Sequence, residues 1–267
     1  MAYIKCIRNL ISSTVPDGKT VTPTDDISIW LACGGRSETY TTLSQVLADS
    51  TCTAALMADD NAVDYLVRST TWASSITGDE DAMDEIGANN YCADQLLGDS
   101  TWNTAICNSV YFESVLNLKV PVMTSNTTPS GSCYGSPAAA SGFEFYKAFD
   151  ENNSTYYSGG TDIKPGDFLG YNFQRDVNCR KVYIRGNQLV YPSNTTIKIV
   201  GVKNEGGSFV DYDIKTNIPH TTGDQVIILD NPDTYVAYKF VVTSGTGSGG
   251  TQVFATYECQ FYGRADI

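Results

Sequence analysis

The chain has 267 residues and a formal net charge of −13, with 17 basic and 30 acidic side chains. This length exceeds the usual size of one domain, so two or more domains are expected. An acidic chain without a basic cluster is a poor partner for nucleic-acid phosphates or for an anionic membrane surface. The acidity is concentrated in residues 1–120, which hold 6 basic and 16 acidic side chains.

The sequence has no apolar run long enough to cross a membrane, and charges interrupt residues 1–10, unlike a secretory signal peptide. We therefore expect synthesis in a cytoplasm and release without a signal peptide. In that compartment the eight cysteines are expected to be reduced, buried thiols. Cys133 and Cys259 lie near the two ends of the C-terminal region, and the sequence leaves open whether they pair.

Residues 1–40 mix short apolar segments with turn residues such as Val15–Lys19. We interpret them as an N-terminal arm or anchoring region. The alternative is a first layer that caps the repeats that follow.

Residues 41–118 contain a repeat of ten residues. Two apolar columns define it, four residues apart, which is helical spacing. The first column is Cys52, Ala62, Trp72, Ala82, Cys92, Trp102 and Phe112, and the second is Leu56, Leu66, Ile76, Ile86, Leu96, Ile106 and Leu116.

One continuous helix does not fit this repeat, because at 3.6 residues per turn the apolar stripe would slip by roughly 80° per unit. Polar pairs such as Asp79-Glu80, Asn89-Asn90 and Asp99-Ser100 separate the units and suit helix N-caps. The sequence therefore predicts a decapeptide helical repeat of short helices that must stack to be stable.

Residues 119–267 alternate short strand patterns with turns rich in Gly, Asn and Asp, after a linker that holds Pro121 and Pro129. Period-two patterns occur at residues 168–173, 182–184, 197–199, 226–228 and 238–242. Short strands at this density predict an antiparallel β-sandwich.

The segment Lys147–Tyr157 joins an apolar anchor, Ala148 and Phe149, to a cluster of oxygen-bearing side chains. Its Asn and Ser residues favour a tight loop. Oxygen ligands from a loop suit a hard cation such as calcium, although loops of this composition often bind nothing.

Three motifs resemble the discoidin, or F5/8 type C, family, which includes galactose-binding modules of carbohydrate-active enzymes. They are Ala-Phe-Asp…Thr-Tyr-Tyr at residues 148–157, Leu-Gly-Tyr-Asn-Phe at residues 169–173 and Glu-Cys-Gln-Phe-Tyr-Gly at residues 258–263. The resemblance covers about Val122 to Gly263. It implies a discoidin-like jelly roll for this part of the chain.

Many members of that family hold a structural Ca²⁺, and the resemblance implies the same here. The implied ligands are the carbonyl of Lys147, the side chains of Asp150, Asn152 and Thr155, the carbonyl of Tyr257 and the side chain of Glu258. Tyr157 departs from the family, which often has Trp at that position.

The resemblance also implies a glycan-binding function without catalysis. Loop aromatics and polar residues bind the sugar in that family, and the candidates here are Tyr156, Tyr157, Tyr191, His220 and Tyr235. No residue pattern indicates a nucleophile with its base, since His220 is the sole histidine of the sequence.

Decapeptide helical repeats beside a discoidin-like module are similar to virion proteins of tailed bacteriophages. We therefore expect a fibre or decoration protein, a dimer or trimer, attached to other virion proteins by its N-terminal half. Its C-terminal domain would adhere to cell-surface or mucosal glycans. The alternatives are a purely structural assembly or decoration protein without a sugar site, and a bacterial surface carbohydrate-binding module.

Overall fold

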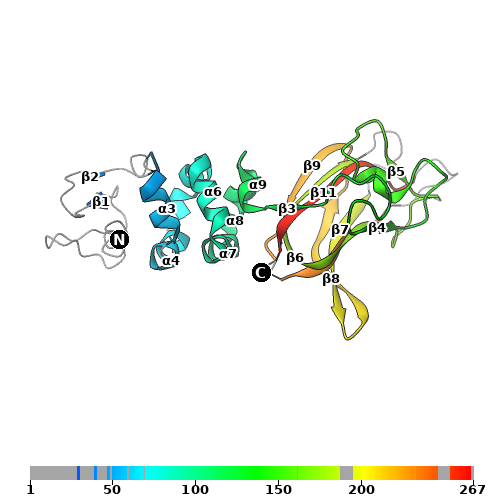
Figure 1. Cartoon of the computed structure of the whole chain (residues 1–267). Helices are drawn as coiled ribbons and strands as arrows, with labels where there is room; N and C mark the ends of the chain where they lie inside the picture. The colour runs from blue at the N-terminus through cyan, green and yellow to red at the C-terminus, as the bar shows by residue number, and fades with distance from the viewer. Residues whose placement is uncertain are drawn as a thin grey trace. The chain divides into compact units, whose positions relative to one another are not determined.

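The computed structural model describes residues 29–30, 39–40, 47–48, 50–58, 60–68, 70–160, 162–186, 195–231, 233–245 and 253–265. The chain divides into two compact units, residues 1–117 and residues 118–267. The described part of the first unit is mainly short helices, and the second unit is built from strands (Figure 1). In the predicted N-terminal arm, β1 (Ile29–Trp30) pairs antiparallel with β2 (Thr39–Tyr40).

The described helices of the first unit are at most nine residues long, and most begin ten residues apart. They are α3 (Ser50–Ala58), α4 (Asp60–Arg68), the 3-10 helix η1 (Thr70–Trp72) followed by α5 (Ala73–Thr77), α6 (Glu80–Ala88), α7 (Asn90–Gly98), α8 (Ser100–Asn108) and α9 (Phe112–Val115). None of the helices in these described ranges has the length and apolar character needed to cross a membrane.

Acidic or amide side chains cap the N-termini of three of these helices. Asp79 accepts a hydrogen bond from the backbone N–H of Ala82 at 2.9 Å, and Asn89 accepts one from Cys92 at 3.0 Å. Asp99 caps the N-terminus of α8 in the same way. These polar side chains therefore satisfy backbone N–H groups at the start of each helix.

Each helix also packs against the third helix after it: α3 on α6, α4 on α7, α5 on α8, and α6 on α9. Side chains reach across these stacks to main-chain carbonyls. Asn89 Nδ2 donates to Met57 O at 3.0 Å, and Ser109 Oγ donates to Thr77 O at 2.5 Å. Three consecutive helices therefore complete one turn of a spiral, and the next turn stacks on it.

The predicted Leu and Ile column is buried at all seven positions. The structure adds a third buried column that the apolar pattern does not reveal, because its members are chemically mixed. They are Thr53, Val63, Ala73, Met83, Ala93 and Asn103.

The second unit is an antiparallel β-sandwich, as the sequence predicts. Its strands are β3 (Leu118–Lys119), β4 (Ser132–Gly135), β5 (Tyr157–Ser158), β6 (Phe168–Gly186), β7 (Thr196–Glu205), β8 (Ser208–Pro219), β9 (Gly223–Ile228), β10 (Tyr235–Ser244) and β11 (Ala255–Ala265). A 3-10 helix, η2 (Phe145–Ala148), precedes the predicted oxygen-rich loop.

Strand β6 belongs to both layers of the sandwich. Residues 168–172 pair with β4 and β10, whereas residues 178–186 pair with β9 or β11. Between these parts Gln174 has a φ of 59°, and residues 174–176 are exposed, so the strand turns a corner there. One layer is therefore β4-β6-β10-β7-β8, and the other joins β9, β6 and β11, with β3 and β5 pairing with β11.

The core between the layers is rich in aromatic rings. Phe240 of β10 and Phe261 of β11 lie 5.0 Å apart between centroids, and Phe149 lies 5.9 Å from Tyr171. Phe149 is fully buried. The chain on either side of it is therefore anchored to the core.

The five cysteines whose side chains the structure describes are buried thiols outside any disulfide, including Cys133 and Cys259. The pairing that the sequence left open between these two does not occur. Cys6 and Cys33 lie outside the described residues, and so does the side chain of Cys52.

Candidate functional site

The oxygen-rich loop folds around Asp150. Asp150 Oδ1 accepts a hydrogen bond from the backbone N–H of Asn152 at 3.1 Å, and its Oδ2 accepts one from Thr155 Oγ1 at 2.7 Å. Glu151, between them, has a φ of 51°, so the chain reverses direction there. The turn brings the side-chain oxygens of Asp150 and Thr155 together. The loop begins immediately after the buried Phe149 in the sequence.

Strand β11 supplies a second carboxylate through a bulge. Thr256 pairs with Gly186 and Glu258 pairs with the adjacent Arg185, so Tyr257 is an extra residue on β11. Such a bulge redirects the side chains beside it. Glu258 is only 7% exposed, and neither of its carboxylate oxygens has a hydrogen-bond partner. An unpaired charge in such a position is unfavourable unless a cation balances it.

The charges of the loop act on Glu258. Burial, and then the charges of Asp150 and Glu151, raise the pKa of Glu258 to about 8. Backbone N–H groups nearby lower it in part, although none reaches hydrogen-bond geometry. Lys147 Nζ lies 4.0 Å from Asp150 Oδ2, at the limit of an ion pair.

These residues fit a small hard cation, because Asp150, Thr155 and Glu258 offer only oxygen. Asn152 is placed differently: it is exposed, and its Oδ1 accepts a hydrogen bond from Ser154 N at 3.0 Å. Within the described ranges, no three His, Cys, Asp or Glu side chains group as a metal site. A cation here would therefore also need hydroxyl and main-chain oxygens.

Three of the five predicted glycan-binding residues are buried, so that prediction is wrong for them. Tyr157 is fully buried in the core, and Tyr235 and His220 are nearly so. A ring must be accessible to stack on a sugar. The sequence pattern did not reveal this burial, because alternation along a strand does not say which face is inside.

His220 illustrates the error best. His220 lies in the predicted loop, between β8 and β9, but its ring packs against Phe254 at 6.1 Å between centroids. Burial lowers its pKa to about 4. The imidazole is therefore neutral near pH 7 and belongs to the core.

The two remaining candidates are Tyr156 and Tyr191. Tyr156 is half-buried between Phe143, at 5.0 Å, and Tyr257, at 5.5 Å between centroids. Tyr191 lies outside the described residues.

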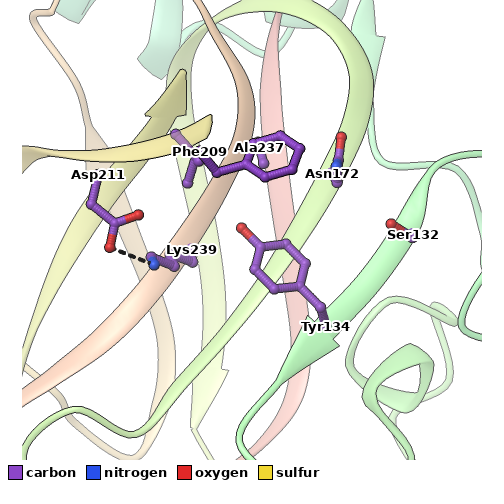
Figure 2. Close-up of a pocket in the computed structure, with 8 residues that line it drawn as sticks. Ser132, Tyr134, Asn172, Phe209, Asp211, Ala237 and Lys239 are labelled. Carbon is purple, nitrogen blue, oxygen red and sulfur yellow. Dashed lines mark hydrogen bonds and ion pairs between the residues drawn. The ribbon is translucent and has the colours of Figure 1, made fainter. Parts of the chain in front are cut away.

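The sandwich carries a pocket that the sequence did not indicate, which we call the trough. It has a volume of about 240 Å³ and lies on the outer face of the layer β4-β6-β10-β7-β8 (Figure 2). Its lining is Ser132, Tyr134, Asn172, Val202, Phe209, Asp211, Ala237 and Lys239. This volume is below the roughly 300–1,000 Å³ of sites for drug-sized ligands, so the trough suits one small ring.

Small residues on the central strands let the side chains that line the trough pack closely across the sheet. Ala237 lies on β10, and Gly170 of β6 pairs with both Tyr134 and Lys239. A Cβ on Gly170 would lie 2.6 Å from Lys239 Cβ and 3.0 Å from Tyr134 Cζ, so no larger residue fits. The walls are Tyr134 on β4 and Phe209 on β8.

One wall is polar. Lys239 Nζ lies 2.6 Å from Asp211 Oδ2. Burial, and then the charge of Asp211, raise the pKa of Tyr134, so its hydroxyl stays neutral and can donate. Figure 2 shows this hydroxyl directed towards the space between Phe209 and Lys239.

The other wall is apolar and open to solvent. Phe209 is 64% exposed, one residue after the start of β8. It follows the β7–β8 turn, where Gly206 and Gly207 have positive φ angles. The sequence did contain a signal for the exposure of Phe209. In the segment Phe-Val-Asp-Tyr-Asp, Phe209 stands at the same alternate positions as two acidic residues, which favour the solvent face of a strand. Its partners, however, come from four other strands, and a single sequence does not give their register.

No protein-family model matches the sequence, and no curated protein matches it either. Solved structures do show similarity. Chitosan-binding module 1 of a chitosanase/glucanase from Paenibacillus sp. IK-5 is 21% identical, with a TM-score of 0.41, over 52% of this chain and 98% of that chain. The family 32 CBM from C. perfringens NanJ, solved with galactose, is 15% identical, with a TM-score of 0.41, over 54% and 99%.

A third structure, CBM62 from Clostridium thermocellum Xyl5A, is 20% identical, with a TM-score of 0.41, over 51% of this chain and 96% of that chain. At these identities and TM-scores the comparisons assign no ligand and no binding residue to this chain.

Proposed function

We propose that the second unit is a non-catalytic glycan-binding module held together by calcium. We further propose that the chain is a bacteriophage virion protein, of fibre or decoration type, that displays this module. The observation that carries glycan binding is the trough, where an exposed aromatic ring faces a wall of hydrogen-bonding groups.

A pyranose has an apolar face of C–H groups and a rim of hydroxyls, and the trough offers a complement to each. Phe209 supplies a flat apolar surface, and Asn172, Asp211 and Lys239 supply donors and acceptors. The shallow, open shape suits one sugar unit of a longer glycan. Weak binding at one site is the expected result, because little surface is buried.

Calcium would bind between the Asp150 loop and β11. Asp150, Thr155 and Glu258 would be its side-chain ligands, with the carbonyls of Lys147 and Tyr257 beside them. Asn152 would need to turn its amide oxygen away from Ser154 or use its second lone pair. The ion's role is to neutralise Glu258 and to fix the loop to the last strand.

The helical unit would serve as the attachment to other virion proteins. Several copies in a dimer or trimer would convert weak binding at each trough into avidity for cell-surface or mucosal glycans. Stacked short helices support this role, since a repeat can be lengthened without changing the module it carries.

A glycan array probed with the full chain tests the proposal. We expect binding to at least one saccharide, and Phe209→Ala should weaken it about tenfold, equivalent to about 1.4 kcal/mol. The control is Val226→Ala on β9, because Val226 is another exposed apolar residue, at 53%, outside the trough.

Absence of binding to any saccharide would favour a purely structural decoration protein. Binding that Phe209→Ala leaves intact would place the sugar elsewhere on the chain. Mass spectrometry of purified virions tests the attachment, and absence of the chain from particles would favour a bacterial surface module.

A further inference from the structure

The polar wall of the trough contains one ion pair, whose two partners are unequally exposed. The Lys239 side chain is 15% exposed, whereas that of Asp211 is 55% exposed. A ligand that enters the trough therefore contacts the Asp211 carboxylate first and then the Lys239 ammonium group beside it.

Lys239 also contacts an aromatic ring. Its Nζ lies 5.2 Å from the centroid of the Phe168 ring, in addition to the 2.6 Å contact with Asp211. A cation that is already neutralised and seated on a ring is a poor receptor for a second anion.

The other groups of the trough add no positive charge. Ser132, Tyr134 and Asn172 are neutral donors and acceptors, and the remaining lining is apolar. The neighbouring Lys198 is itself paired with Asp213 at 2.6 Å. The trough is therefore neutral overall, with a negative group on its open side.

We propose, resting on the glycan-binding function above, that the trough selects neutral saccharides through two neighbouring hydroxyls. One hydroxyl donates to Asp211, and the adjacent one accepts from Lys239, while the ring lies against Phe209. A sugar that carries a carboxylate or sulfate is rejected, because it faces the Asp211 charge with no free cation in compensation.

The test compares a neutral saccharide that binds on the array with its counterpart oxidised to a carboxylate at C6. Titration of the full chain at low salt should show at least tenfold tighter binding of the neutral form. Asp211→Asn keeps the shape of the side chain and leaves Lys239 without its anionic partner. It should weaken binding of the neutral form severalfold and strengthen binding of the acidic form, so that the preference is lost or reversed.

Asp213→Asn is the matched control, because it breaks the adjacent pair on the same strand without touching the trough lining. It should leave the preference unchanged, and melting curves should show that both variants fold. Equal binding of both sugars by the unmodified chain, or an unchanged preference in Asp211→Asn, would overturn this inference alone. Absence of binding to any saccharide would overturn the glycan-binding function as well.

Discussion

Glu258 is a buried carboxyl on the last strand of the sandwich. The bulge at Tyr257 turns its carboxylate inward, where burial and the charges of Asp150 and Glu151 raise its pKa to about 8. Without a cation, the folded state therefore keeps this carboxyl mainly protonated at neutral pH, which costs free energy relative to the unfolded chain, where it ionises. The proposed calcium ion would convert the same group into a cross-link between the loop and β11.

This account predicts opposite effects of Glu258→Gln in the presence and absence of calcium. The unmodified chain should melt at a higher temperature with calcium, since a ligand present at a hundred times its Kd adds about 2.7 kcal/mol. The amide variant should lose that response. In chelator it should be at least as stable as the unmodified chain, because it lacks the carboxyl that burial keeps from ionising in the folded state.

Differential scanning calorimetry of both chains, with calcium and with chelator, measures these shifts. Glu151→Gln is the control for charge, because Glu151 also raises the pKa of Glu258 but is not a proposed ligand, so this variant should keep the response to calcium. A Glu258→Gln chain that melts lower than the unmodified one in chelator would show that the protein itself stabilises the carboxylate.

Residue roles could be predicted from the sequence only in part. The motif around Asp150 and the one around Glu258 indicated that these side chains belong together, and the charge of Asp150 does act on Glu258. Burial of Tyr157, Tyr235 and His220 could not be predicted, because each stands in a polar stretch whose orientation depends on partners elsewhere in the sheet.

At the scale of elements, the helical unit depends on close contact between helices three apart. Gly87 of α6 shows this, since a Cβ there would lie 1.9 Å from the carbonyl oxygen of Ser114, which belongs to α9. The closeness of the two backbones leaves no room for a side chain. Gly98, at the end of α7, has no atom within 4 Å of the same position.

Gly87→Ala should therefore destabilise the helical unit by about 1–3 kcal/mol, the usual cost of overpacking. Gly98→Ala should be neutral or stabilising by up to about 1 kcal/mol, because alanine favours the helix. Urea unfolding followed by circular dichroism at 222 nm compares the two variants. Equal effects of the two substitutions would contradict the stacking of α6 on α9.

The sequence predicted the elements better than their packing. Ten-residue spacing and polar junctions were sufficient to place helix starts at residues 80, 90 and 100. The third buried column was missed because Thr53, Met83 and Asn103 share no chemistry. The trough was missed for a related reason: its floor and walls meet only through the pairing of five strands.

At the scale of the whole molecule, the chain combines a repeat unit with a sandwich that has its own core. The net charge of −13 fits a surface that must avoid nonspecific contact with phosphates. It also fits recognition of uncharged sugars better than recognition of acidic ones. The central claim is that the outer face of the β4-β6-β10-β7-β8 layer is where the glycan binds.

Nuclear magnetic resonance of the labelled full chain, titrated with a saccharide chosen from the array, tests this claim most directly. Backbone amide signals of Gly170, Asn172, Phe209 and Ala237 should shift the most as the sugar is added. Shifts confined to residues outside the trough, such as the loop around Tyr156, would contradict the account.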